Sequence, residues 1–99
     1  MAKILSMINL DQRTAPEIGA SIASRVRMRR KELKLTQEQL SRKAGMSLAS
    51  YKRFEQKGLI SLDALIRIAM ALDCEDDFDG LFSKRGYASI EEVLRGQSR

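Results

Sequence analysis

The sequence predicts an all-α domain, and three observations support this prediction. The chain has 99 residues, of which 43% are apolar, with a single proline, a composition that favours one modest helical core. Apolar residues recur at spacings of three and four in several segments, as on the buried face of a helix. Ser or Thr precedes several of these segments, as helix caps do. We expect five helices within residues 16–82, after an arm at 1–15 and before a polar tail at 83–99.

The first helix is expected to begin near Pro16 and to end near Leu33. Proline is favoured at the first helical position, and Glu17 suits the positive end of the helix dipole. The expected buried stripe comprises Ile18, Ile22, Val26 and Leu33. The weak alternation of residues 1–13 leaves a strand, packing on the core and a mobile arm as open alternatives.

Two short capped helices follow, joined by a tight turn. Thr36 is placed to cap a helix at 37–43, and Ser47 to cap one at 48–56. Gly45 lies between them, where a helix end needs the positive φ that glycine adopts readily. Leu40, Ala44, Tyr51 and Phe54 are expected to face the core, with Met46 beneath the turn. A capped helix, a turn with glycine and a second capped helix form the layout of a DNA-reading helix-turn-helix.

Two further helices complete the expected domain. Ser61 is placed to cap a helix at 62–72, whose expected inner residues are Leu62, Leu65, Ile66, Ala69 and Leu72. A last helix at 76–82 would close the core with Phe78, Leu81 and Phe82. Residues 89–92 read as a capping box, which predicts one or two more helical turns.

The composition argues against several classes of function. Histidine is absent and Cys74 is the single cysteine, which removes the commonest general base and metal ligand, and any intrachain disulfide. No run of about 18 apolar residues occurs, as a membrane span requires. We therefore expect a cytoplasmic protein that is not an enzyme, with no catalytic residues, no metal, no cofactor and no membrane partner.

The charge pattern favours an anionic partner. The formal net charge is +5, and six basic residues crowd positions 25–34 with Glu32 alone opposing them. Five carboxylates gather at positions 73–79. A molecule with one basic and one acidic half can orient itself on a phosphate surface.

Candidate DNA contacts lie on the two capped helices. A helix that enters the major groove presents small or polar side chains, while Arg53 is long enough to pair with guanine and Gln37 is placed to meet a phosphate. The residues expected to contact DNA are Thr36, Gln37, Ser47, Leu48, Ala49, Ser50, Lys52, Arg53 and Lys57. The alternatives are that the Thr and Ser residues act as caps alone, that the lysines are ordinary solvated side chains, and that Leu48 contacts a protein partner.

The sequence resembles the Xre/Cro-type repressors, including those of lambdoid phages. The resemblance runs through residues 21–37, 36–40 and 61–72, and it covers the chain from Ser21 to Phe82. It implies a five-helix lambda-repressor-like domain that binds operator DNA as a dimer, with Gln37 and residues 47–53 on DNA. It also implies a buried ion pair between Arg30 and Glu55. Leu48 and Ala49 depart from the polar base-reading residues often found there, so readout is expected to depend more on Arg53 and DNA shape.

A narrower resemblance is to the DNA-binding antitoxins encoded beside HipA-type kinase toxins. It rests on residues 53–56, Gly58 and residues 60–62, with residues 76–78, 81–82 and 87–94 compatible. The function expected is a dimeric autorepressor that binds a palindromic operator and acts as the antitoxin of a HipA-like kinase. The alternatives are a phage-type repressor, or a module that neutralises or recruits a partner protein with DNA binding secondary.

Overall fold

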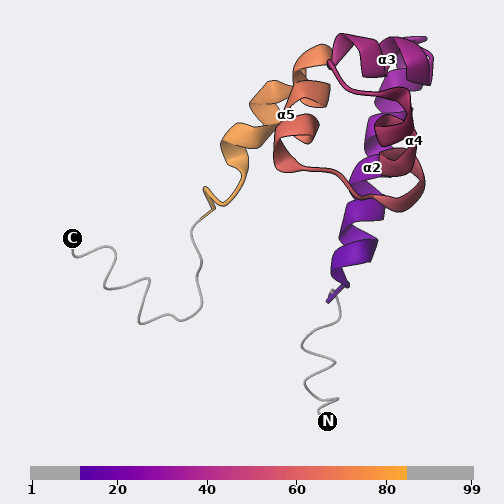
Figure 1. The fold of residues 1–99 in the computed structure, drawn as a ribbon. Coiled ribbons are helices and arrows are strands. Elements are labelled where there is room, and N and C mark those ends of the chain that lie inside the picture. Colours follow the sequence, from indigo (N-terminus) through magenta and orange to yellow (C-terminus); the bar gives the residue numbers. More distant parts are fainter. Residues whose placement is uncertain (1–11, 85–99) are drawn as a thin grey trace, which may run out of the picture.

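The computed structural model describes residues 12–84, and this part of the chain is entirely helical (Figure 1). It contains four α-helices and one 3₁₀ helix, and residues 12–84 include no strand. The elements are α2 (Ala15–Glu32), α3 (Gln37–Lys43), α4 (Leu48–Lys57), α5 (Leu62–Ala71) and η1 (Glu75–Gly80). The all-α fold predicted from the sequence is thereby confirmed.

Each α-helix begins at a side-chain cap. The Thr14 hydroxyl accepts a hydrogen bond from the Glu17 amide, and the Glu17 carboxylate accepts one from the Thr14 amide. Thr36 and Gln39 form the same reciprocal box at the start of α3. Ser47 and Ser61 cap α4 and α5 through the amides three residues later. These caps satisfy amides that have no partner within the helix, and they explain why local sequence located the helix starts to within a residue.

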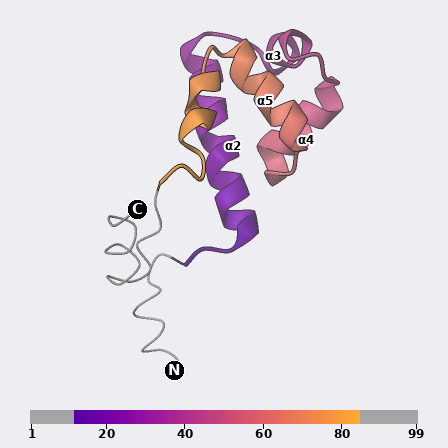
Figure 2. The same cartoon turned by 90° about the vertical axis from the view of Figure 1, so that its left-hand side faces the viewer.

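The core lies where α3, α4 and α5 meet one side of the long helix α2 (Figure 2). Its largest fully buried side chains are Tyr51, Phe54, Leu40 and Ile68. The rings of Tyr51 and Phe54 pack edge to face with centroids 6.1 Å apart, a favoured geometry for aromatic pairs. One face of α4 is therefore fixed inside the domain, as the sequence predicted.

Three apolar residues assigned to the core from periodicity are exposed, so those assignments were wrong. Ile18, Leu33 and Leu62 have relative exposures of 40%, 45% and 63%. Ile18 lies in the first turn of α2, Leu33 follows the last residue of α2, and Leu62 is the first residue of α5. Side chains at helix ends extend beyond the neighbouring helix, and spacing alone does not show where that neighbour stops.

The expected last helix also differs from the structure. Residues 75–80 form a 3₁₀ helix, after which Leu81 is extended and Phe82 has a φ of 61°. Because the chain turns away here, Leu81 and Phe82 do not close the core, and Phe82 is 95% exposed. Leu72 is buried at this end of the core instead, and Cys74 packs against it.

Most of the expected arm (residues 1–11 of 1–15), most of the expected tail (residues 85–99 of 83–99) and the capping box at 89–92 lie outside the described residues. No helix described here combines the length and the apolar character needed to cross a bilayer.

The start of α2 crosses the end of α4 at a contact between two glycines. Gly58 ends α4 in the left-handed conformation, with a φ of 70°, and its amide donates to the Phe54 carbonyl. A Cβ atom on Gly19 would lie 2.8 Å from the Gly58 oxygen, and one on Gly58 would lie 2.7 Å from the Gly19 carbonyl carbon. The two backbones approach this closely because neither residue has a side chain.

Candidate nucleic-acid interface

The turn between α3 and α4 closes on backbone hydrogen bonds. Gly45 has a φ of 69°, its amide donates to the Arg42 carbonyl, and the Met46 amide donates to the Ser41 carbonyl. Met46 is half-buried and packs against the core. The chain then reaches Ser47, which caps α4. These local bonds form the tight turn and the cap that join the two helices.

Arg67 of α5 holds this turn from a third helix. Its Nη1 atom donates to the carbonyls of Ala44 and Gly45, at 2.9 and 2.7 Å. Its Nε atom donates to Asp63 at 3.0 Å. Carbonyls at the end of α3 that have no intrahelical partner are therefore satisfied by a cation. This contact was not predicted from the sequence, where its one local signal is the four-residue spacing of Asp63 and Arg67.

We expect the change Arg67→Met to lower the free energy of unfolding by about 1–2 kcal/mol, because two charge-assisted hydrogen bonds to a partly exposed turn are lost. Urea unfolding followed by circular dichroism measures this. Arg42→Met is the matched control, since Arg42 forms an exposed pair with Glu38 on the same helix and such pairs contribute about 0–1 kcal/mol. Equal effects for the two variants would contradict the role given to Arg67.

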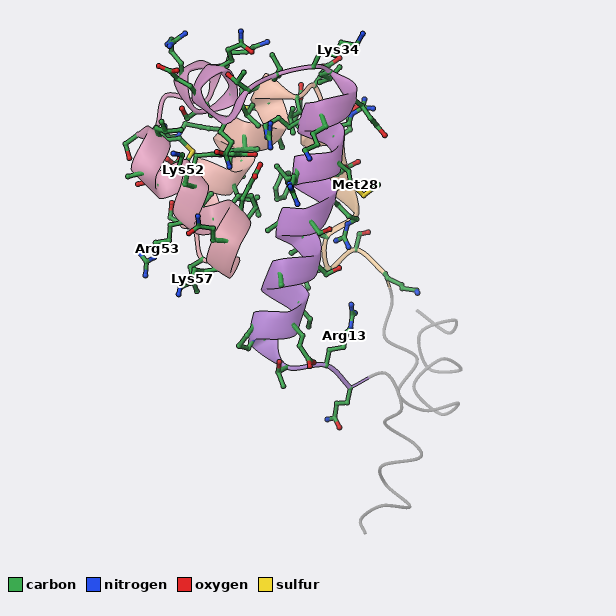
Figure 3. All side chains as sticks on the ribbon, turned by 90° about the vertical axis from the view of Figure 1, so that its right-hand side faces the viewer. Arg13, Met28, Lys34, Lys52, Arg53 and Lys57 are labelled. Carbon is green, nitrogen blue, oxygen red and sulfur yellow. The ribbon has the colours of Figure 1, made fainter. Side chains whose placement is uncertain are left out.

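The outward face of α4 carries the residues expected to meet DNA. Ala49, Ser50, Lys52, Arg53 and Lys57 are exposed, and Leu48 is half-buried. Figure 3 shows Lys52, Arg53 and Lys57 extending from α4 on the side away from α2. Small side chains at the start of α4 and a long cation one turn later leave room for close approach to base edges.

The two serines at the start of α4 differ in what they can still donate. The Ser47 hydroxyl accepts from the Ser50 amide and donates to the Ser50 hydroxyl oxygen at 2.9 Å. Its hydrogen is therefore used within the cap, whereas the Ser50 hydroxyl hydrogen is free to meet an acceptor. Both serines border an open hollow of about 470 Å³ between α4 and α5, together with Arg53 and Arg67.

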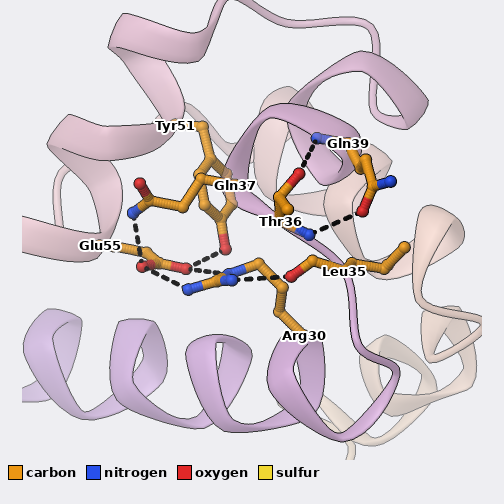
Figure 4. A network of polar contacts seen from close by, with 7 residues as sticks. All are labelled: Arg30, Leu35, Thr36, Gln37, Gln39, Tyr51 and Glu55. Atoms are coloured by element: carbon orange, nitrogen blue, oxygen red, sulfur yellow. Dashed lines mark hydrogen bonds and ion pairs between the residues drawn. The ribbon is translucent and has the colours of Figure 1, made fainter.

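Glu55 is the centre of a buried polar network that joins three helices (Figure 4). Arg30 of α2 donates to it from Nε at 2.8 Å and from Nη2 at 3.3 Å, and from Nη1 to the Leu35 carbonyl. Gln37 Nε2 at the start of α3 donates to Glu55 at 2.9 Å, and the Tyr51 hydroxyl donates to the same carboxylate. The side chains of Arg30 and Glu55 are 9% and 5% exposed, so the ion pair implied by the family resemblance is present and buried.

The position of Gln37 in this network limits its expected DNA contact. One N–H of its amide is used by Glu55, so the second N–H is the donor left for a phosphate. The predicted contact of Gln37 with DNA did not include this hydrogen bond to Glu55. The Gln37 side chain is oriented by the same carboxylate that binds Arg30.

The network shifts the pKa values of its members. Burial alone raises the pKa of Glu55, but hydrogen bonds from Arg30, Tyr51 and Gln37 outweigh it, and the pKa lies below its ordinary value of 4.5. Burial, with the hydrogen bond to Glu55, raises the pKa of Tyr51. Glu55 is therefore ionised, and Tyr51 protonated, throughout the neutral range.

This lowered pKa predicts how stability changes with pH. The contribution of ionised Glu55 is fully present above about pH 4.5, the ordinary pKa, and is lost as the pH falls through the lower folded-state pKa. The difference in unfolding free energy between the native protein and Glu55→Gln should therefore shrink on acidification below pH 4.5. Urea unfolding at a series of pH values measures it, and a difference that stays constant down to pH 2 would refute this expectation.

Comparison with known proteins identifies the family to which the chain belongs. Residues 26–78, more than half of the chain, match the model of the helix-turn-helix family. The chain belongs to the helix-turn-helix family. A Rhodospirillum rubrum protein, described as an uncharacterized transcriptional regulator in the ATPase CF(0) region, is 38% identical over 69 residues. The alignment covers 69% of this chain and 64% of that relative, and no solved structure gives a significant match.

These findings support a DNA-binding helix-turn-helix domain of the kind found in transcriptional regulators. The match includes α3, the turn and α4, together with residues 26–32 of α2 and all of α5. It therefore includes both partners of the Arg30–Glu55 pair and the Arg67 contact to the turn. In this helix-turn-helix domain, α4 occupies the place of the recognition helix.

Proposed function

We propose that this protein is a sequence-specific regulator of transcription that reads double-stranded operator DNA with α4. The observation that supports this most is the division of α4 into two faces. Tyr51, Phe54 and Glu55 fasten one face to the domain, while Lys52 and Arg53 are exposed on the other. A helix held in this way can enter the major groove without rearrangement of its side-chain anchors.

Each outward residue is assigned a role by its chemistry. Arg53 pairs with guanine O6 and N7, Ser50 donates its free hydroxyl hydrogen, and the half-buried Leu48 contacts a thymine methyl group. Lys52, Lys57 and the second N–H of Gln37 contact phosphates. Thr36, Ser47 and Ala49 complete the proposed surface, the first two mainly as caps and the last as a small residue that permits close approach.

We further propose that the protein binds as a homodimer and represses its own promoter. Two α4 helices about 34 Å apart would read successive major grooves of a palindromic site. Leu62 and Met70 on α5 are exposed by 63% and 59%, and Ile66 lies between them at a four-residue spacing. Exposed apolar side chains on one face are typical of surfaces that bind another protein, which supports self-association.

Fluorescence anisotropy tests the central proposal. Purified protein is titrated onto DNA from immediately upstream of its own gene and onto scrambled DNA, at several salt concentrations. Tight binding to the first DNA that falls steeply with salt is the expected result. Weak and equal binding to both would refute operator recognition. Sedimentation of the protein with and without DNA tests the dimer separately.

The variant Arg53→Ala tests the assignment of α4. We expect it to reduce the preference for operator over scrambled DNA by about 1–3 kcal/mol for each half-site, the contribution of one arginine–guanine pair. Arg25→Ala is the charge-matched control, because Arg25 contacts Ser21 within α2. If both variants leave the preference unchanged, α4 is not the reading helix.

The antitoxin assignment is a narrower part of the proposal. It is supported by the resemblance to antitoxins of HipA-type kinases and by the acidic stretch at residues 73–79, beside the exposed Phe82. Co-expression with a HipA-like kinase encoded beside the gene tests it through relief of growth arrest and co-purification. Binding of that kinase without operator binding would favour the alternative, a protein-interaction module.

A further inference from the structure

A second open hollow lies between α2, α3 and α4, beside the buried network. Its volume is about 590 Å³, and it is lined by Arg27, Arg30, Thr36, Gln37, Glu55 and Gln56. None of the DNA contacts predicted from the sequence lies on α2. Arg27 is an α2 residue that lines this hollow.

The charged side chains around this hollow are paired with each other, with one exception. Arg30 is paired with Glu55, and Gln37 uses one amide N–H on the same carboxylate. Arg27 is exposed, and it forms no ion pair or side-chain hydrogen bond with any residue in the range 12–84. Nearby Arg25 and Arg29, by contrast, contact Ser21 and Glu32.

The hollow therefore has the character of an anion site. Arg30 and Glu55 cancel in charge, so Arg27 leaves one net positive charge at its wall. The donors that remain are the Arg27 guanidinium, the second N–H of Gln37, the Gln56 amide and the Thr36 hydroxyl, which donate to nothing else within residues 12–84. A phosphodiester carries one negative charge and accepts hydrogen bonds without donating any, so it matches this set of donors.

We propose that Arg27 is a DNA contact on α2, and that it binds a backbone phosphate over this hollow next to Gln37. The inference rests on the proposed function, since the phosphate belongs to the DNA that α4 reads. Arg27 would add one phosphate contact at a point set by α2. Arg30 on α2 binds Glu55, which lies two residues after Arg53 on α4, and this bond ties α2 to α4. The phosphate contact of Arg27 would therefore fix the depth and tilt of the reading helix.

Arg25 provides a matched control within the same helix. Arg25 and Arg27 are two residues apart, so they point about 200° apart around α2. The variants Arg25→Ala and Arg27→Ala each remove one positive charge, at nearly the same position along the axis of α2. A general electrostatic effect would be similar in both, whereas a direct contact would appear in Arg27→Ala alone.

The experiment measures binding to operator and scrambled DNA between 50 and 200 mM salt. Each lost phosphate contact lowers the salt slope by about 0.9. Over a fourfold change in salt, Arg27→Ala should therefore reduce the loss of affinity relative to the native protein by about 3.5-fold for each bound subunit, which is about 12-fold for the proposed dimer. We expect this reduction with both DNAs, because a phosphate carries no sequence information. Arg27→Lys should restore most of the slope.

Three results would overturn the proposal in different ways. If the salt slopes of Arg25→Ala and Arg27→Ala are equal, Arg27 acts only through the general electrostatic field and makes no direct phosphate contact. Loss of operator binding alone in Arg27→Ala would assign the residue to base readout. Absence of binding by the native protein to either DNA would overturn the proposed function itself, and this inference with it. Circular dichroism of each variant confirms that the exposed substitution leaves the fold intact.

Discussion

Replacing Glu55 with alanine is expected to lower the free energy of unfolding by about 3–5 kcal/mol. The change removes the acceptor of four hydrogen bonds and leaves the Arg30 guanidinium buried without its counter-charge. Small domains have about 5–15 kcal/mol of stability in total. Denaturant unfolding followed by circular dichroism gives the value.

The exposed pair between Arg29 and Glu32 supplies the control for this prediction. Its side chains are 48% and 60% exposed, so Glu32→Ala should cost less than about 1 kcal/mol. The double variant Arg30→Met with Glu55→Met separates burial of an unpaired charge from loss of the pair, and it should recover part of the stability. A loss below about 1 kcal/mol in Glu55→Ala would show that the pair is not structurally important.

The change Gly58→Ala should destabilise the domain by about 2–5 kcal/mol. A left-handed conformation costs a residue with a Cβ atom about 1–2 kcal/mol, and overlap with neighbouring atoms adds about 1–3 kcal/mol. The Cβ atom would lie 2.7 Å from the carbonyl carbon of Gly19 and 2.8 Å from the amide nitrogen of Ala20. Both are backbone atoms, so α2 itself would have to move. The unfolding free energy again measures the effect.

Gly80 is the matched control for this substitution. A Cβ atom there meets nothing within 4 Å, so Gly80→Ala should change stability by less than about 0.5 kcal/mol. Gly19→Ala tests the contact from its other side. Alanine normally stabilises a helix interior relative to glycine by about 1 kcal/mol, and here the sign should reverse. A stabilised Gly19→Ala variant would contradict the close approach of the two backbones.

The helix starts could be predicted because each depends on residues within one turn. Thr36 and Ser47 act on amides three positions later, so the signal is complete in the local sequence. The inward face of α4 could be predicted in the same way, since Tyr51 and Phe54 are large apolar residues three positions apart. Local chemistry thus defined both the helix-turn-helix and the face of α4 that remains outside.

Features that depend on where helices cross could not be predicted in this way. Leu33 and Leu62 fit the apolar spacing, yet no helix within residues 12–84 covers them. The contact of Arg67 with Gly45 spans 22 residues, and the contact between residues 19 and 58 spans a longer stretch of the chain. The Arg30–Glu55 pair, 25 residues apart, was implied by family resemblance and by no local pattern. The candidate site shows the same limit, because the place of Arg27 follows from the packing of α2 against α4.

The contact of Arg67 with the turn has a consequence for protein engineering. A peptide that contains α3 and α4 alone would lack the cation that satisfies the Ala44 and Gly45 carbonyls, and it would lack Arg30 for Glu55. Such a fragment would not retain the angle between its helices, so transplanting it into another scaffold would fail. DNA preference should instead be transferred by exchanging the outward side chains of α4 within the intact domain.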